Sequence, residues 1–354
     1  MPADLALDLH GLSAAWSNRT GPTVANDGTE LAWSVMDSAS KGSDGHVPDI
    51  AAFTPGVDSE PRIVYSHPDR DSLIWEVAVR DGQYAFLEFN SRLLGGENGW
   101  RLWALPAANA KAVLLDTRDG PPDDPRPGPS FVLTRDGIVW TAVHDRQGVP
   151  TYELRTARLD GSGNRTLLTS PAKTLQYWYP SVDPSGTTIA YATVAHAGSG
   201  YAFRVWSLDL TAAPAVPTRL GDSDVATQPV ANESHLAWRI ADENVSNESS
   251  AMVLAGRDGS GATTVGVQRL TNLSIGNRFV GFDAIEHVRL ELYDLQAQRL
   301  VTVERHAQPE TLGFQPGWTR VAGDLLVFRR VDYFNADDPA DSQIVWARLP
   351  APAE

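Results

Sequence analysis

The sequence predicts an all-β protein of the seven-bladed β-propeller class, and two observations carry this prediction. Seven short segments read aliphatic, small, aromatic: Leu31-Ala32-Trp33, Tyr84-Ala85-Phe86, Ile138-Val139-Trp140, Ile189-Ala190-Tyr191, Leu236-Ala237-Trp238, Val280-Gly281-Phe282 and Leu326-Val327-Phe328. The aromatic residues follow one another at steps of 53, 54, 51, 47, 44 and 46 residues. A recurrence of about 40 to 50 residues, built only from strands and turns, is typical of a radial β array.

The repeat extends along all 354 residues, which favours one large domain over residues 1–354. A single small sheet cannot bury its own faces, so successive sheets must pack on one another. The expected blades cover approximately residues 13–66, 73–118, 129–170, 177–221, 227–267, 268–306 and 312–349.

Within each blade the sequence predicts a series of short strands. The fourth blade is the clearest, with strands expected at residues 179–182, 187–194, 203–210 and 217–220. Large and small residues alternate along these strands, so they point to opposite faces of the sheet. The repeated tryptophans are therefore expected in the core between neighbouring blades.

The two ends of the chain complement each other. The seventh blade has no fourth strand before the chain stops, whereas residues 4–10 alternate polar and apolar before the first complete blade. We therefore predict that residues 4–10 pair with residues 344–349 and close the last blade. Closure removes exposed strand edges, which otherwise promote aggregation.

One turn resembles a known repeat. The segment Val182-Asp183-Pro184-Ser185-Gly186, followed by Thr187-Thr188-Ile189-Ala190-Tyr191, is similar to the WD40-like (PD40/TolB-type) propeller repeat, in which a Ser-Pro-Asp-Gly turn precedes a strand. The resemblance implies a propeller of a kind often found outside the cytoplasm and often engaged in protein contacts.

Composition restricts the function classes. A net charge of −15 repels phosphate backbones, which argues against nucleic-acid binding. No apolar run approaches the ~20 residues of a membrane span. Cysteine is absent, which excludes disulfides and thiolate chemistry. The excess of arginine over lysine indicates a bacterial source. We expect an extracytoplasmic protein whose export signal is not in the chain, although a cytoplasmic location stays open.

Polar residues recur four positions after the repeated aromatics, where long loops, residues 145–150 and 195–201 among them, are expected to share one rim. Two residues join this set: His196, which follows the alanine found at one of these positions, and the aromatic Trp178. The expected ligand-binding rim thus consists of Asp37, Asn90, His144, His196, Asp242, Glu286, Asp332 and Trp178. The four acidic residues Asp37, Asp242, Glu286 and Asp332 are candidates for holding Ca²⁺ or Mg²⁺, because such cations prefer carboxylate oxygens. A simpler explanation is that these residues are polar only because strand ends are exposed to solvent.

Three functions fit this surface. The first is a non-catalytic, monomeric propeller that binds a protein or a small ligand over the long-loop rim. The second is a propeller enzyme, a lyase or hydrolase, that uses His144 or His196 as a general base beside a divalent cation. The third is a carbohydrate-binding propeller in which Trp178 and its aromatic neighbours stack on sugar rings. The sequence contains no Gly-x-Ser-x-Gly or His-Glu-x-x-His motif.

Overall fold

The computed structural model describes most of the chain. It covers residues 3–13, 16, 23–25, 27–35, 47–70, 72–89, 99–118, 128–147, 149–170, 175–197, 200–240, 250–267, 270–284, 289–305, 315–331 and 342–352. The strands in these residues form seven sheets, one of five strands and six of four. Each sheet is built from strands that are consecutive in the chain, with short N-terminal strands added to two of the sheets.

The strands of the seven sheets follow chain order. The first sheet is β3 (Thr23–Val24), β4 (Leu31–Val35), β5 (Asp49–Phe53) and β6 (Arg62–Ser66); the second is β7 (Leu73–Arg80), β8 (Gln83–Phe89), β9 (Trp100–Leu105) and β10 (Val113–Arg118). The third is β11 (Phe131–Thr134), β12 (Gly137–Arg146), β13 (Val149–Ala157) and β14 (Arg165–Ser170); the fourth is β15 (Gln176–Val182), β16 (Thr188–Ala197), β17 (Gly200–Asp209) and β18 (Thr218–Leu220). The fifth is β19 (Ala226–Ala231), β20 (His235–Ile240), β21 (Ser250–Gly256) and β22 (Thr263–Val267).

The last two sheets each receive a strand from the start of the chain. The sixth sheet is β23 (Leu270–Ile275), β24 (Phe279–Ala284), β25 (Arg289–Asp294) and β26 (Arg299–Arg305), extended by β1 (Ala3–Asp4). The seventh is β27 (Gln315–Ala322), β28 (Leu325–Val331) and β29 (Ser342–Arg348), completed by β2 (His10–Gly11).

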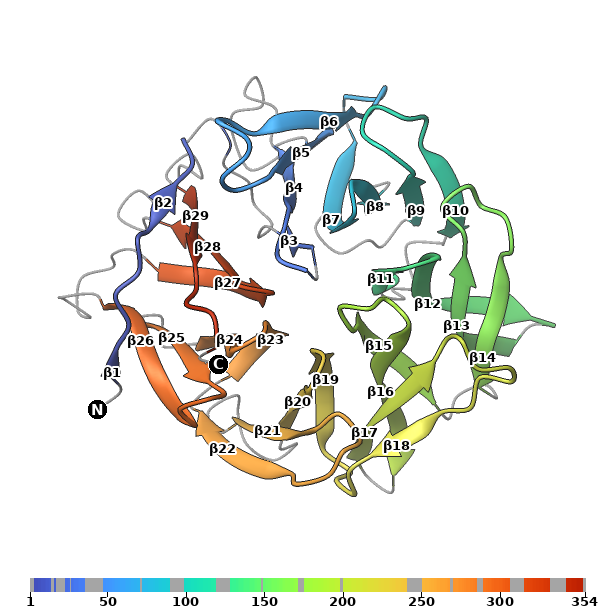
Figure 1. Cartoon of the computed structure of the whole chain (residues 1–354). Helices are drawn as coiled ribbons and strands as arrows, with labels where there is room; N and C mark the ends of the chain where they lie inside the picture. Colours follow the sequence, from blue (N-terminus) through green and yellow to red (C-terminus); the bar gives the residue numbers. More distant parts are fainter. Residues whose placement is uncertain are drawn as a thin grey trace. The chain divides into compact units, whose positions relative to one another are not determined.

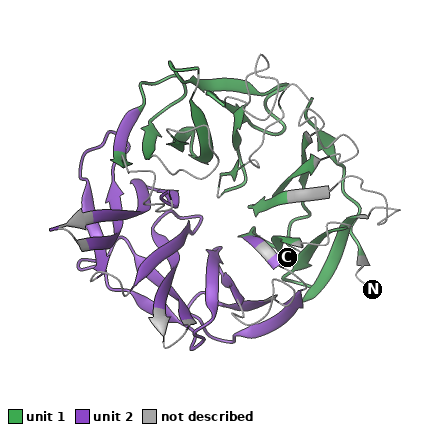
Figure 2. Ribbon diagram, turned by 180° about the vertical axis from the view of Figure 1, so that it is seen from behind, with its two compact units in different colours: residues 1–112, 116–125, 274–354 green, residues 113–115, 126–273 purple. Residues whose placement is uncertain are grey.

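The chain divides into two compact units, which Figure 2 distinguishes by colour. Unit 1 contains residues 1–112, 116–125 and 274–354, and unit 2 contains residues 113–115 and 126–273. The third, fourth and fifth sheets belong to unit 2, while β10 and β23 contribute residues to both units.

In both units, neighbouring sheets pack through the repeated aromatics. In unit 1, Trp33 of β4 lies in one buried cluster with Leu325 of β28 and Ile344 of β29, which joins the first sheet to the seventh. In unit 2, Trp238 of β20 packs in one cluster with Ala190 and Ala192 of β16. Large side chains of one sheet thus lie against small residues of the next, and the expected core position of the tryptophans is confirmed.

The N-terminal segment completes the seventh sheet, but its pairing differs from the predicted register. His10 and Gly11 of β2 pair with Trp346 and Val345 of β29, whereas the start of the segment, β1, pairs in parallel with β26 of the sixth sheet (Figure 1). The prediction that residues 4–10 as a whole pair with residues 344–349 is therefore wrong in register. Leu5, Leu7 and Leu9 pack on a buried cluster of the sixth and seventh sheets, so their apolar contacts position the segment.

Two of the loops expected at the rim are continuations of strands. In the β12–β13 hairpin, pairing extends to Asp145 with Pro150 and to Arg146 with Val149. In the β16–β17 hairpin, it extends to His196 with Tyr201 and to Ala197 with Gly200. In both hairpins the last described pair joins residues only three positions apart in the chain. The expectation of long loops at residues 145–150 and 195–201 is wrong.

In the part of the chain that the structure describes, no helix has the length and apolar character needed to cross a membrane.

Candidate functional site

Most residues of the predicted rim cannot be placed. Asp37, Asn90, Asp242, Glu286 and Asp332 lie outside the described residues. His144 lies near the end of β12, opposite Thr151, and His196 pairs with Tyr201 through the backbone of β16. The described residues contain no group of three or more acidic or histidine side chains that could hold a metal ion. All four predicted cation ligands fall outside that search, so the Ca²⁺ or Mg²⁺ site stays a prediction.

The aromatic run at the start of the fourth sheet, which includes Trp178, is described in full. Tyr177 is buried, Trp178 is half-buried, and Tyr179 keeps 40% of its surface exposed. The Trp178 and Tyr179 rings meet edge to face, with centroids 5.5 Å apart. Trp178 Nε1 donates to Gln176 Oε1 at 2.9 Å, so the indole is fixed and the phenol is the more accessible ring.

Tyr179 is exposed because the first strand of its sheet is bulged. Its φ is +48°, a left-handed conformation that a bulky residue rarely adopts, and the pairing register of β15 with β16 shifts between Trp178 and Ser181. Extra residues at such a bulge leave the ladder, and their side chains can point away from the sheet.

The same irregularity recurs in the first strands of other sheets. Positive φ occurs at Gln228 of β19, Asn272 of β23 and Trp318 of β27, and the register of β19 and of β27 shifts at these positions. In β7 the register shifts around Trp75. Left-handed non-glycine residues cost about 1–3 kcal/mol each and concentrate at functional sites. We therefore define two bulge sites, one in each unit.

The unit 1 bulge site comprises Glu76 of β7, Asp283 of β24, and Trp318, Thr319 and Arg320 of β27. Trp318 has φ +57° and is 38% exposed. The buried carboxylate of Asp283 holds its backbone: Oδ2 accepts from Trp318 N at 3.0 Å, and Oδ1 accepts from Thr319 N at 2.8 Å. The neighbouring sheet thus fixes the bulge that exposes the indole.

The site also includes a carboxyl group, that of Glu76, whose pKa is shifted. Glu76 is an exposed residue, yet the surrounding protein desolvates its carboxylate and raises its pKa to about 7, against the opposing effect of the Arg320 guanidinium. A carboxyl group with a pKa near neutrality changes charge under physiological conditions. Perturbed pKa values of this kind are common at functional sites.

The unit 2 bulge site comprises Trp178, Tyr179, Gln228 and Arg239. Arg239 lies in β20 opposite Thr227, the residue before the bulge at Gln228. Burial lowers the pKa of Arg239, and the charge interaction that opposes this effect is with Tyr179. The site thus takes in the bulged residues Tyr179 and Gln228 of two first strands that are in contact, β15 and β19.

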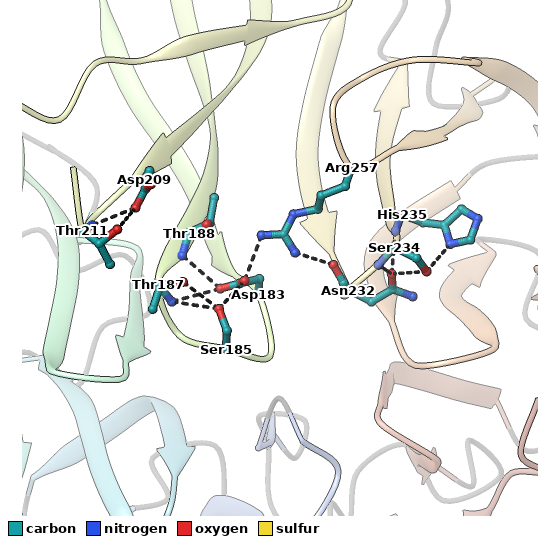
Figure 3. Close-up of polar contacts among 10 residues, drawn as sticks. All are labelled: Asp183, Ser185, Thr187, Thr188, Asp209, Thr211, Asn232, Ser234, His235 and Arg257. Carbon is teal, nitrogen blue, oxygen red and sulfur yellow. Dashed lines mark hydrogen bonds and ion pairs between the residues drawn. The ribbon is translucent and has the colours of Figure 1, made fainter.

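The turn that resembles the WD40-like repeat has a structural role (Figure 3). Asp183 Oδ1 accepts from the backbone N–H groups of Thr187 and Thr188, and Asp183 Oδ2 accepts from Arg257 Nη2 at 2.8 Å. Arg257 Nη1 also donates to the carbonyl of Asn232 at 2.6 Å. Burial raises the pKa of Asp183, but hydrogen bonds from Ser185 and Arg257 outweigh it and hold the pKa below its ordinary value. The turn thus ties the fourth sheet to the fifth.

Comparison with solved structures identifies the fold. The β-propeller domain of the trilobed protease from Pyrococcus furiosus, described as having an open velcro topology, superposes with a TM-score of 0.60 at 8% identity, over 94% of this chain and 93% of that one. A prolyl endopeptidase matches with a TM-score of 0.59 at 13% identity, over 96% of this chain and 49% of its own. An acylaminoacyl peptidase from Pyrococcus horikoshii matches with a TM-score of 0.57 at 9% identity, over 91% of this chain and 51% of its own.

These similarities and the seven sheets show that the chain has the seven-bladed β-propeller fold, as the sequence predicts. The chain spans about half the length of the two peptidase chains. At this level of identity the likeness concerns the fold alone. No family model matches the chain and no curated protein sequence matches it, so membership of the WD40-like (PD40/TolB-type) family stays a prediction.

Proposed function

We propose that this chain is a non-catalytic binding propeller that holds extended peptide segments against its bulge sites. One observation carries the proposal: Tyr179 in unit 2 and Trp318 in unit 1 are both exposed at left-handed bulges in the first strands of their sheets. Aromatic residues dominate the energetics of protein interfaces, because they bury a large area and lose few rotamers on binding.

The hydrogen bonds that hold the Trp318 bulge in place indicate that the exposure of Trp318 serves a function. An exposed tryptophan in a strained conformation needs the rest of the structure to hold it, and Asp283 supplies two hydrogen bonds from a buried position. A purely structural tryptophan would gain more from burial, as Trp33 and Trp140 do.

An extended ligand suits this arrangement better than a compact one. Within unit 2, β15 packs against β19, so the bulges at Tyr179 and Gln228 belong to neighbouring first strands. Successive irregular positions offer separate contacts for successive residues of a peptide. Similarity to propellers found in peptidases adds support for a peptide ligand.

The test is retention of a synthetic library of random ten-residue peptides on the immobilised chain. Tyr179→Ala and Trp318→Ala should each weaken the retained peptides by about tenfold or more, the usual cost of losing an aromatic hot spot. Tyr201→Ala is the matched control, because Tyr201 is a 48% exposed tyrosine of β17 outside the bulges. No retained peptides, or an equal loss in Tyr201→Ala, would overturn the proposal. So would retention of glycans alone, which would favour the carbohydrate alternative.

A further inference from the structure

The first residues of the chain lie as an arm along the outer edges of the sixth and seventh sheets (Figure 1). We call residues 3–10 the N-terminal arm. Its backbone pairs at the two ends: β1 runs parallel to β26, and His10 of β2 lies opposite Trp346 of β29. Between these ends, residues 6–9 form no backbone–backbone hydrogen bond with the described residues. The middle of the arm is therefore held by its side chains.

The side chains of the arm alternate between an apolar and an exposed set. Three half-buried leucines, Leu5, Leu7 and Leu9, pack on one cluster of buried residues, while the residues between the leucines are exposed. The cluster belongs to the sixth and seventh sheets and includes Val301 and Val345; we call it the arm-docking surface. An extended segment with an apolar residue at every second position matches this surface, because its successive side chains point to opposite sides.

The arm joins the rest of the chain at Gly11. Directly after Gly11, Leu12 is buried in the cluster between the first and seventh sheets, and its N–H donates to the carbonyl of Ile344 at 2.9 Å. Directly before Gly11, the ring of His10 is exposed and stacks on that of Trp346, with centroids 4.4 Å apart. Glycine has the widest choice of backbone conformations. Gly11 is thus a joint between a buried anchor and an arm that lies on the surface.

Lifting the arm breaks only the pairings of β1 and β2. β26 stays paired with β25, and β29 stays paired with β28 along its whole length. The two sheets lose the cover of two strand edges and of the arm-docking surface, and exposed edges promote pairing with another extended segment. The structure shows that the arm fits this surface, and a second copy of the chain brings an identical arm.

We propose that the N-terminal arm is exchanged between two copies of the chain, each arm turning at Gly11 and docking on the sixth and seventh sheets of the other copy. The inference goes beyond the proposed function, because the arm-docking surface shares no residue with the bulge sites. The contacts made in the exchange are those that the arm makes within one chain, so the exchange costs little beyond association itself. The chain's own arm competes at an effective concentration in the millimolar range. The chain should therefore be monomeric in dilute solution and form dimers as its concentration approaches about 1 mM.

Analytical ultracentrifugation tests the exchange from about 10 µM to about 1 mM chain, in about 0.3 M salt to screen the repulsion between two chains of net charge −15. The parent chain should convert to a dimer with rising concentration, to roughly one half at the upper end. Val57→Ser is the control, because Val57 is a 79% exposed apolar residue of unit 1 outside the arm, and it should dimerise as the parent does. A parent chain that stays monomeric throughout, or a dimer that is lost in Val57→Ser, would overturn the inference.

A disulfide trap locates the contact, since the chain has no cysteine of its own. His10→Cys is introduced in one batch and Trp346→Cys in another, and the two batches are mixed under slow oxidation by glutathione. The two positions lie opposite each other across the β2–β29 ladder, where Cα atoms are about 4.5–5.5 Å apart, within the range that a disulfide spans. A covalent dimer of the two variants should form. Tyr201→Cys in place of Trp346→Cys, at a 48% exposed residue outside the arm-docking surface, should give at least about tenfold less dimer.

The same trap tests the leucines of the arm. Adding Leu5→Ser, Leu7→Ser and Leu9→Ser to the His10→Cys batch should reduce the covalent dimer by at least about tenfold, because the arm loses its apolar contacts with the docking surface. An equal yield from this batch, or an equal yield with Tyr201→Cys, would show that the arm does not dock on the second copy and would overturn the inference.

A second pair of positions covers the case in which Trp346→Cys does not fold, which circular dichroism would reveal. Asp4→Cys and Thr302→Cys replace residues that pair between β1 and β26, so they repeat the trap at the other end of the arm. Linking at either end supports the exchange. The absence of a covalent dimer at both ends would overturn it.

Discussion

Replacing Asp283 with alanine removes the support of the Trp318 bulge. Asp283 is 6% exposed, and its two carboxylate oxygens accept the N–H groups of Trp318 and Thr319 at 3.0 and 2.8 Å. Thr319 is 1% exposed, so solvent cannot replace its lost acceptor without rearrangement of the strand.

The magnitude follows from these contacts. Leaving a buried N–H unsatisfied costs about 1–3 kcal/mol, and the half-exposed N–H of Trp318 adds less. Removing a desolvated carboxylate and allowing the left-handed Trp318 to relax return part of this cost. We expect Asp283→Ala to lower the free energy of unfolding by about 2–3 kcal/mol. Asp283→Asn should cost about half as much, because an amide offers one acceptor oxygen to two donors.

Urea denaturation followed by circular dichroism measures the effect, with an expected fall in midpoint of roughly 0.8 M for an m-value near 3 kcal/mol/M. Asp209→Ala is the control: Asp209 also accepts two hydrogen bonds, from Thr211, but in an exposed turn, so its loss should cost less than about 1 kcal/mol. An Asp283→Ala variant as stable as the parent, or no less stable than Asp209→Ala, would refute the reasoning. The same variant should lose the Trp318-dependent part of peptide retention.

Two further predictions concern stability in unit 1. The pKa of Glu76 is raised from 4.5 to about 7 in the folded state. Its favourable contribution to the free energy of unfolding is therefore fully present below about pH 4.5 and is lost as the pH rises through 7. Between pH 5 and pH 8, the free energy of unfolding of the parent chain should fall by about 1 kcal/mol relative to that of Glu76→Gln, after allowance for solvent screening of an exposed group. A difference in urea midpoint between the two chains that stays constant over this pH range would contradict the prediction. Deleting residues 1–12 should cost about 4 kcal/mol, because it removes Leu12 from the core and the partly buried Leu5, Leu7 and Leu9, and it uncovers the edges of β29 and β26. An unchanged melting temperature would show that the N-terminal segment does not stabilise these sheets.

The fold could be predicted from the sequence because its signal is local and repeated. Each aliphatic–small–aromatic triplet places a large residue on one face and a small one on the other, and the packing of Trp238 on Ala190 and Ala192 follows from that alternation. The role of the N-terminal segment followed from a missing strand in the last blade. The register of this segment could not be predicted, because its pairing with β26 and β29 depends on the apolar contacts that Leu5, Leu7 and Leu9 make in the folded chain.

The bulge sites could not be predicted in the same way. Tyr179 and Trp318 have no side-chain property that demands a positive φ, so their exposure depends on contacts from other strands, such as those of Asp283. One signal was available: Pro180 and Pro229 directly follow two of the bulged residues, and a residue without an N–H fits where a ladder is interrupted. Which described residues lie around a bulge is a long-range property that no spacing in the sequence reveals.

The most direct test of the binding account is ¹⁹F NMR of the chain labelled with 5-fluorotryptophan, with its 11 resonances assigned by single Trp→Phe replacements. When retained peptides are added, the account predicts shifts at Trp178 and Trp318, while the buried Trp33 and Trp140 stay unchanged. Shifts confined to other tryptophans, with Trp178 and Trp318 unmoved, would contradict it.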